Sequence, residues 1–206
     1  MTKGQRTRER LLRAAIDRFG AEGFRATAVS QLSRDAGLTP AAAYAYFADK
    51  DAFWIAAVAS DLDALDGEIR SAALASDRPL YDLMAGLIAG LRRHPLIHRV
   101  LEEGTPEDLL LVLAHPLFAE TTKVIADRLQ QRIDHGALPP GSDAVDLARG
   151  IETVLFSMVL SIVRAGLQED SDRIWSVVNL LRAAAGGPPT PGELFDRRAA
   201  DSPSGT

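Results

Sequence analysis

The chain has 206 residues, 47% of them hydrophobic, which is enough for one or two globular domains with a sizeable core. It contains no cysteine, and this excludes disulfide bonds, thiolate metal sites and a cysteine nucleophile. The formal net charge is −5 at pH 7, and the first residues are polar and basic without the apolar segment of a secretory signal, so we expect a cytoplasmic protein.

Charge is distributed unevenly along the chain. Residues 1–50 contain nine Lys or Arg against five Asp or Glu, a net charge of +4, which leaves −9 for the remainder. A basic head on an acidic body is expected when only the head meets the phosphates of a nucleic acid. Solvated arginines on an ordinary first helix would give the same pattern, so charge alone does not decide between these interpretations.

The first predicted element is a helix from about Thr7 to Ala21, because apolar residues recur every three or four positions. These positions are Leu12, Ala15, Ile16 and Phe19. Residues 1–8 are expected to form a mobile basic arm that can lie against phosphates without specifying a sequence. Beyond the helix, we expect Phe24 to pack on the core of the head, facing Phe47.

Residues 26–51 are interpreted as two short helices joined by a tight turn, followed by the start of a third. Thr27 precedes the first of these helices, where its hydroxyl can cap free N–H groups. Gly37 follows the last residue of that helix, where left-handed backbone ends a helix at little cost. Thr39 then caps a second helix, predicted from Pro40 to Phe47, with proline at its first position.

The second of these helices begins with small side chains. Its first turn, Pro40 to Ala43, carries only small side chains, and Tyr44 and Tyr46 follow. Small residues let the backbone approach a large surface closely, and tyrosine hydroxyls are neutral hydrogen-bond donors. The pattern favours a helix-turn-helix whose second helix enters the major groove of DNA with its N-terminus first.

Three segments of this region agree in register with a known pattern: residues 23–29 (GFRATAV), 36–39 (AGLT) and 44–51 (YAYFADKD). Together they resemble the DNA-binding domain of the TetR family of bacterial transcriptional regulators, whose usual run is roughly A-G-V-S-x-G-x-L-Y-x-H-F-x-x-K-E. The residues that match this run outright are Tyr44, Phe47 and Lys50. The positions that differ from it are Leu38, Thr39, Ala41, Ala43, Tyr46 and Asp51. The largest difference is Tyr46, in place of histidine.

The resemblance implies an all-α protein with an N-terminal three-helix helix-turn-helix DNA-binding domain and a larger C-terminal helical ligand-binding and dimerisation domain. It also implies a homodimer that binds operator DNA, most often a repressor that a small effector releases. By motif position, the resemblance assigns phosphate contacts to Thr27, Thr39, Tyr44, Tyr46 and Lys50. The leading edge of the recognition helix would consist of Pro40, Ala41 and Ala42. Base reading would rest on methyl contacts from these alanines, or on Arg25 and the tyrosines, and both alternatives stay open.

A long helix from about residue 50 to 75 is expected to join the head to the body, with Asp49 as its N-cap. Three later pairs each place a capping residue before a proline at a first helical position. These pairs are His94-Pro95, Thr105-Pro106 and His115-Pro116. We therefore predict helices near residues 95–103, 106–114 and 117–135. An apolar stripe from Leu80 to Leu91, after a break at residues 76–79, predicts another helix near 79–91.

Two further helices, predicted at about 143–167 and 172–185, could pack with their copies in a second chain as a four-helix interface. The residues expected in that interface are Ile151, Leu155, Met158, Val159, Ile162, Ile174, Val178 and Leu181. The alternative is that both helices are internal core. The most apolar run, residues 154–163, is too short to span a membrane. Residues 187–206, rich in Pro, Ser and Gly, are expected to be a disordered tail.

A small hydrophobic or amphipathic effector is expected among the body helices, in a mostly apolar pocket with few polar groups. The residues predicted to line it are Trp54, Met84, Leu87, His98, Leu111 and Phe118. The resemblance implies that the ligand favours one spacing of the two heads, which matters because half-sites recur about 34–36 Å apart. The alternative is a filled core without a cavity, because apolar stripes look the same in both cases.

Catalytic and metal chemistry find little support in the sequence. His94 and His98 are four residues apart, but Pro95 places His94 at a helix cap, and no cysteine or carboxylate triplet completes a metal site. There is no Gly-rich phosphate loop and no G-x-S-x-G elbow. We therefore expect neither an enzyme nor a bound cofactor or metal.

We predict a DNA-binding domain at residues 1–48, an effector-binding and dimerisation domain at 49–186, and the tail at 187–206. The expected partners are double-stranded operator DNA, a second copy of the chain and an unknown small molecule, with no membrane. Two alternatives stay open. One is a helix-turn-helix protein without a ligand, controlled by a protein partner, and the other is a helical enzyme with a coincidental head.

Overall fold

The computed structural model describes residues 2–74, 86–166 and 172–184, and within these ranges the chain is helical with no strand. The all-α prediction is confirmed. The helices are α1 (Lys3–Ala26), α2 (Val29–Asp35), α3 (Pro40–Tyr44), α4 (Lys50–Leu74), α6 (Pro95–Glu103), α7 (Pro106–Leu113), α8 (Pro116–Asp134), α9 (Ala144–Ala165) and α10 (Asp172–Ala184).

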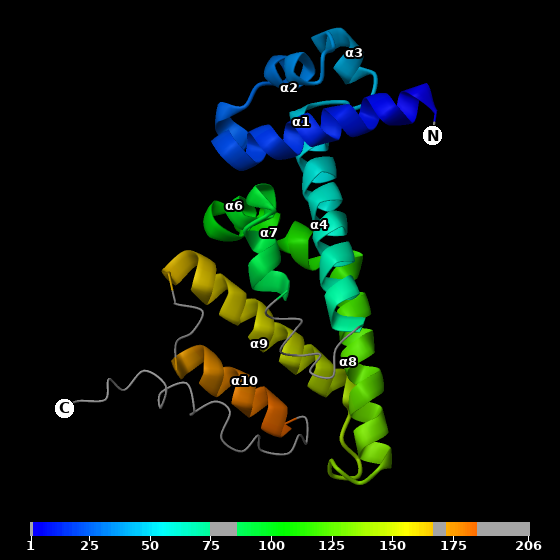
Figure 1. The fold of residues 1–206 in the computed structure, drawn as a ribbon, viewed down its shortest axis with the longest axis vertical. Helices are drawn as coiled ribbons and strands as arrows, with labels where there is room; N and C mark the ends of the chain where they lie inside the picture. Colours follow the sequence, from blue (N-terminus) through cyan, green and yellow to red (C-terminus); the bar gives the residue numbers. More distant parts are fainter. Residues whose placement is uncertain (1, 75–85, 167–171, 185–206) are drawn as a thin grey trace, which may run out of the picture.

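The molecule is elongated, with a helical head at one end. Figure 1 shows that α1, α2 and α3 form this head and that α4 runs from it into the body. Helices α6 and α7 lie beneath the head next to α4, and α8, α9 and α10 form the far end. Helix α1 packs against both α6 and α4, while α8 packs along α9. Two body helices therefore support the head directly.

The core of the head combines the inward faces of its helices with the first turns of α4. Side chains with 0% exposure in this core are Leu11, Ala15, Phe19, Leu32, Ala43 and Phe53. Full burial of a Leu or Phe side chain stabilises a fold by about 1.5–3 kcal/mol. Phe47 stacks on Phe53 with ring centroids 4.1 Å apart, whereas Phe24 packs edge-on against Trp54 at 5.4 Å. The predicted pairing of Phe24 with Phe47 is therefore wrong, because each ring has a partner on α4.

Helix α1 begins earlier than predicted. The Thr2 hydroxyl accepts a hydrogen bond from the N–H of Gln5 at 3.2 Å, and the Gln5 side chain accepts one from the N–H of Thr2 at 2.6 Å. This capping box fixes the chain from residue 2 onward, so the prediction of a mobile arm over residues 1–8 is wrong for the residues described. At its other end α1 kinks at Gly23, whose φ is +81°, and continues to Ala26.

Most other helix boundaries agree with the predictions to within one or two residues. Helix α3 is shorter than predicted and ends at Tyr44, because the N–H groups of Tyr46 and Phe47 both turn back to the carbonyl of Ala43. The predicted helix at 79–91 lies partly outside the described residues, which are helical from 86 to 91. The predicted tail, residues 187–206, also lies outside them.

The apolar stripe of α9 and α10 faces the core of its own chain. The predicted dimer residues with 2–6% exposure are Ile151, Leu155, Met158, Val159, Ile174 and Leu181. Ile162 is partly buried against the same core, and the side chain of Val178 lies outside the described part of the chain. The prediction of a dimer interface is therefore wrong for the buried members. An apolar stripe marks a buried face, and the chain's own core, to which α8 contributes, covers this one.

Among the described residues, no single helix is both long and apolar enough to cross a membrane. Helices α7 and α8 have the length and composition of a span when taken together, across a bend of 51°.

Candidate nucleic-acid interface and ligand cavity

The turn between α2 and α3 is built as the sequence predicts. Gly37 has a φ of +66° and so ends α2 in the left-handed region that favours glycine. Thr39 accepts a hydrogen bond from the backbone N–H of Ala42 at 3.2 Å, and Pro40 is the first residue of α3. These local predictions for Gly37, Thr39 and Pro40 are confirmed, and together they fix the direction in which α3 leaves the turn.

Helix α3 presents most of its surface to the outside. Its one core residue is Ala43, while the following side chains of Tyr44 and Tyr46 are 51% and 37% exposed. The exposed or partly exposed residues of its first turn are Pro40, Ala41 and Ala42. Figure 1 shows α3 at the outer end of the head, away from the body. A short helix with a bare front and two exposed phenols can dock closely on a large surface such as a DNA groove.

Thr27 does not lie at the surface. Its side chain is 2% exposed, and its hydroxyl donates to the carbonyl of Gly23 at 2.9 Å. The N-cap of α2 is Ala28, whose N–H donates to the side-chain oxygen of Gln31 at 2.7 Å. The capping role and the phosphate contact predicted for the Thr27 hydroxyl are therefore wrong, because that hydroxyl is already bonded inside the head.

Lys50 is the first residue of α4, and Asp49 is confirmed as the N-cap through a 2.7 Å hydrogen bond from a backbone N–H of the first turn. The Lys50 Nζ lies 4.3 Å from the centroid of the Phe24 ring. This cation–π contact holds the ammonium group where the head meets α4. Arg25 and Thr39 are exposed on the same domain. The contacts of these residues with DNA stay predictions.

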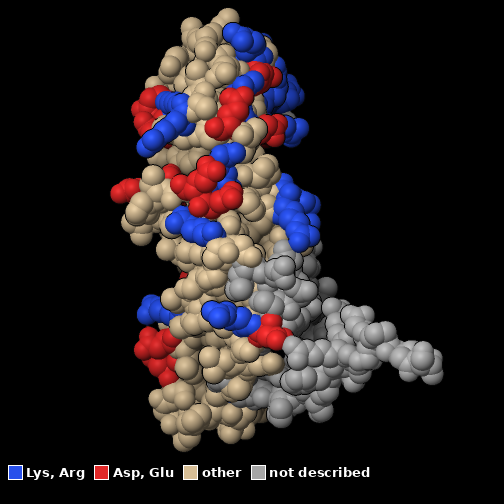
Figure 2. Space-filling model, turned by 90° about the vertical axis from the view of Figure 1, so that its left-hand side faces the viewer, with Lys and Arg blue, Asp and Glu red and all other residues tan. Residues whose placement is uncertain are grey.

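Several arginines of the head bond within it. Arg18 lies 2.6 Å from both Asp35 on α2 and Glu22 on α1. The hydrogen bond from Arg18 lowers the pKa of Asp35, and the same bond raises the pKa of Arg18. Arg10 donates to the carbonyl of Ala36 at the end of α2. Part of the positive charge of the head therefore holds α2 against α1. On the face shown in Figure 2, Lys and Arg lie among Asp and Glu.

Helix α6 meets the head at close range. A Cβ added to Gly20 of α1 would lie 3.0 Å from the backbone nitrogen of Leu96, so a larger residue would push the two helices apart. The guanidinium of Arg99 on α6 donates to the carbonyls of Gly20 at 2.8 Å and Ala21 at 3.0 Å. These two carbonyls lie just before the kink of α1 at Gly23, and the bonds connect this part of α1 to α6.

A second arginine holds the C-terminal end of α6. Arg164, in the last turn of α9, donates to the carbonyls of Leu101 at 2.6 Å and Gly104 at 3.1 Å. Helices α9, α6 and α1 are therefore connected in series through two guanidinium groups. Sequence reasoning missed both groups, because Arg164 is 63 residues from Leu101 and Arg99 is 79 residues from Gly20 along the chain.

Three residues predicted to line the effector pocket lie elsewhere. Trp54 belongs to the aromatic cluster under the head, and its indole N–H donates to Asp108 of α7 at 2.7 Å. The side chain of His98 is 42% exposed on α6. Leu111 packs against the core but is not on the wall of the cavity described below. None of these three residues lines that cavity, and Met84 lies outside the described residues.

The histidines at helix starts are bonded to carboxylates of α4. At the start of α6, His94 Nδ1 lies 2.7 Å from Asp61, with side chains 8% and 6% exposed, and Asp61 also accepts from the N–H of Ile97 at 3.3 Å. At the start of α8, His115 Nε2 lies 3.2 Å from Asp63. In the part of the chain that the structure describes, no group of three His, Asp or Glu side chains is arranged to hold a metal ion.

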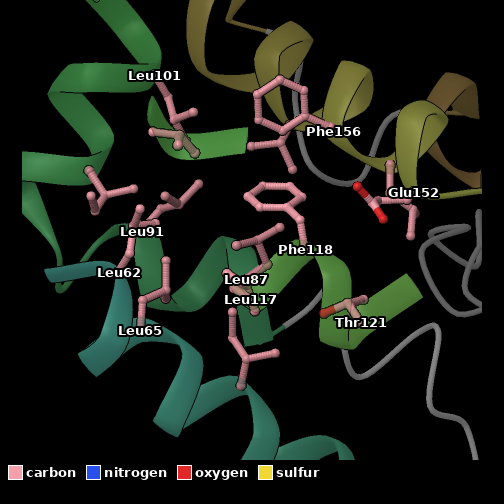
Figure 3. A pocket seen from close by; sticks show the side chains of 15 residues that line it. Leu62, Leu65, Leu87, Leu91, Leu101, Leu117, Phe118, Thr121, Glu152 and Phe156 are labelled. Atoms are coloured by element: carbon pink, nitrogen blue, oxygen red, sulfur yellow. The ribbon is translucent and has the colours of Figure 1, made fainter. Parts of the chain in front are cut away.

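An apolar cavity of about 80 Å³ lies in the body, between α4, α6, α7, α8, α9 and the helical residues 86–91. Two residues predicted to line a pocket, Leu87 and Phe118, do lie on its wall. Figure 3 shows fifteen lining side chains, and the ones that carry oxygen are Thr121 and Glu152. The geometry offers a small hydrophobic ligand an apolar space with two polar groups at one end.

Glu152 is the ionisable residue of this wall. The Thr122 hydroxyl donates to its carboxylate, and burial raises the pKa of Glu152 above the ordinary value although the charge of Arg149 opposes the shift. One turn further along α9, Phe156 packs edge-to-face on Phe118 with ring centroids 5.7 Å apart. Sequence reasoning missed Glu152, but a signal was present, because this charged residue lies one helical turn after the buried Ala148 and one turn before Phe156.

The outward α3 and the cavity-bearing body together form an all-helical protein with a helix-turn-helix head. Residues 11–57 match a family model described as bacterial regulatory proteins, tetR family. This match confirms the resemblance of the head to the DNA-binding domain of the TetR family. The matched range extends into α4, whose first turns complete the core of the head. No curated protein matches the chain.

Solved structures of bacterial regulators share the fold over most of the chain. The fatty acid degradation regulator FadR from Bacillus halodurans has a TM-score of 0.62 at 19% identity, over 90% of this chain and 95% of that one. SmeT, the repressor of the Stenotrophomonas maltophilia multidrug efflux pump SmeDEF, has a TM-score of 0.60 at 22% identity, over 86% and 89%. NalD, a secondary repressor of the MexAB-OprM efflux pump in Pseudomonas aeruginosa, has a TM-score of 0.61 at 17% identity, over 89% and 97%. At these identities the likeness shows the fold alone.

Proposed function

We propose that this protein is a homodimeric transcriptional repressor, released from operator DNA when a small hydrophobic effector enters the body. The observation that carries the proposal is the outward α3, whose bare first turn is followed by the exposed Tyr44 and Tyr46. In this arrangement the first turn enters the major groove, and the tyrosine hydroxyls bond phosphates. Thr39, Lys50 and Arg25 complete the proposed interface. Residues 1–48 supply the DNA-binding domain, and residues 49–186 supply the remainder.

The cavity is the proposed effector site. Its wall is apolar apart from two side chains, as expected for a site that takes a hydrophobic or amphipathic molecule. SmeT, which shares this fold, has been solved in complex with triclosan, and this supports an effector role for the body. The cavity has a volume of about 80 Å³, which requires that the effector be small or that the body expand around it.

The effector acts on the head through α6. Ile97 and Leu101 of this helix line the cavity, while Arg99 between them bonds the end of α1. A ligand that displaces α6 therefore moves a contact of the DNA-binding head and changes the spacing of two heads in a dimer. The ligand needs only different affinities for the two arrangements of α6.

A second copy is proposed to pack against the outer faces of α9 and α10. With the predicted stripe buried, the exposed apolar residues of these faces are Val154, at 37% exposure, and Leu180, at 64%. Small exposed residues surround Val154 on α9: Gly150, Thr153, Ser157 and Ser161. A face of small side chains around one apolar residue allows two identical helices to approach closely in an isologous contact.

Capture of genomic DNA fragments by the purified full-length protein tests the proposed function. Sequencing of the captured fragments should reveal a two-fold symmetric site, because a dimer reads two half-sites. Binding to that site should weaken steeply with salt, as expected when counterions are released from phosphates. Enrichment of no common sequence would contradict the proposal, and enrichment of an unpaired half-site would contradict the dimer.

A further inference from the structure

The one charged group on the cavity wall indicates the kind of ligand that the cavity takes. We propose that its ligand is a small amphipathic organic cation, whose ammonium group pairs with Glu152 while its hydrocarbon part fills the apolar space. This inference rests on the proposed function, in which the cavity is the effector site.

The carboxylate of Glu152 is compensated by one hydrogen bond and by no ion pair among the described residues. The Thr122 hydroxyl donates to Oε2, and Glu152 forms no ion pair with any residue that the structure describes. Arg149 on the same helix is 70% exposed, and its guanidinium lies 3.7 Å from Asp146 on the outer surface. An ionised carboxylate beside an apolar space is costly unless a positive group or several hydrogen bonds compensate it. A ligand ammonium group would supply the missing charge.

The aromatic side chains near Glu152 favour the same chemical group. Phe156 is one turn beyond Glu152 on α9, and Phe118 faces it from α8 with an interplanar angle of 83°. Figure 3 shows the Glu152 carboxylate on the side of the cavity next to Phe118 and Thr121. The face of a phenyl ring attracts a cation within about 6 Å of its centroid. A carboxylate and two phenyl rings on the wall of the cavity therefore favour a cation over an anion of the same size.

The size of the cavity restricts the hydrocarbon part. Its volume is about 80 Å³. One water molecule needs about 10–15 Å³ of such space, so there is room for roughly five to eight non-hydrogen atoms without expansion. The seven non-hydrogen atoms of n-hexylamine fall within about this range. The Thr121 hydroxyl, also on the wall, can accept a second hydrogen bond from an ammonium group.

Calorimetric titration of the full-length protein with three probes of one chain length tests the inference. The probes are n-hexylamine, 1-hexanol and hexanoate, which at neutral pH are cationic, neutral and anionic. We expect n-hexylamine to bind at least about tenfold more tightly than 1-hexanol, because a charge-assisted bond adds to the same apolar contact. Hexanoate should bind most weakly, since its charge repels that of Glu152.

Three variants separate the charge of Glu152 from its size. Glu152→Gln keeps the size and the acceptor for Thr122, so it should remove the preference for n-hexylamine over 1-hexanol while 1-hexanol binds as before. Glu152→Asp keeps the charge and should keep the preference, which covers the case in which the Gln variant does not fold. Glu107→Gln, an exposed position on α7 outside the cavity, should leave all three affinities unchanged.

Binding of 1-hexanol or hexanoate as tight as that of n-hexylamine would overturn the inference, and so would an unchanged preference in a folded Glu152→Gln variant. Absence of binding by all three probes would also overturn it. The affinity for captured DNA, measured on the same protein samples, distinguishes these outcomes from a failure of the proposed function. Intact DNA binding with no preference for the cation refutes the ligand class alone.

Discussion

Replacement of Arg99 by methionine should loosen the contact between head and body. The guanidinium donates to the partly buried Gly20 carbonyl at 2.8 Å, to the exposed Ala21 carbonyl at 3.0 Å, and to Glu103 at 2.8 Å. Methionine keeps the apolar stem and removes these donors. Loss of the donor to a partly buried carbonyl costs about 1–3 kcal/mol, whereas water can replace the donor at an exposed one. The surface pair with Glu103 contributes about 0–1 kcal/mol.

We therefore expect Arg99→Met to lower the free energy of unfolding by about 2 kcal/mol, measured by urea denaturation with far-UV circular dichroism. Arg128→Met is the matched control, because Arg128 is exposed on α8, one of the helices at the far end of the molecule from the head, and its effect should stay within about 0.5 kcal/mol. Arg99→Lys should fall between them, since a single ammonium group does not reproduce the planar fork of guanidinium donors.

A second measurement addresses the link between the cavity and DNA. If α6 transmits the effector signal, the ligand-induced loss of DNA affinity should be smaller in Arg99→Met than in the Arg128→Met control. Equal unfolding free energies in the two variants would refute the energetic reasoning. A full ligand response in Arg99→Met would refute α6 as the connection.

Four further predictions concern separate parts of the molecule. Gly37→Ala should destabilise the head by about 1–2 kcal/mol in thermal unfolding, because alanine is strained at a φ of +66°. Lys50→Ala should weaken operator binding and reduce the salt slope by about one, whereas Lys123→Ala on α8 should change neither; equal effects would contradict the phosphate contact. Val154→Arg should yield a monomer in light scattering, and an unchanged dimer would reject the proposed face. Burial raises the pKa of Glu152, so its contribution to stability is fully present below the unfolded-state value near 4.5 and is lost as pH rises through the folded-state value. Glu152→Gln should therefore flatten the fall in unfolding free energy measured by urea denaturation as pH rises from acid toward neutral.

Features that depend on neighbours within four residues could be predicted from the sequence. Thr39 and Pro40 start α3, Asp49 caps α4, and Gly37 ends α2, because each acts on N–H groups or backbone angles close by in the chain. The His94-Pro95 pair located α6 in the same local way. Helical periodicity located α9 closely, since that helix needs one apolar face wherever it packs. The family motif could be recognised for the same reason, because its residues are nearly contiguous.

Features that depend on which distant residue lies opposite could not be predicted. The periodicity of α9 identified a buried face correctly, but the chain's own core covers that face rather than a second chain. Thr27 has a hydroxyl suited to capping, yet the kink at Gly23 places a carbonyl closer to it. Arg99 connects α6 to the head, and Glu152 is the charged residue of the cavity wall. The groups around both of them come from residues remote in the chain. Apolar residues that recur every 3.6 positions show that one face of a helix is covered. The packing of whole helices decides which residues cover it.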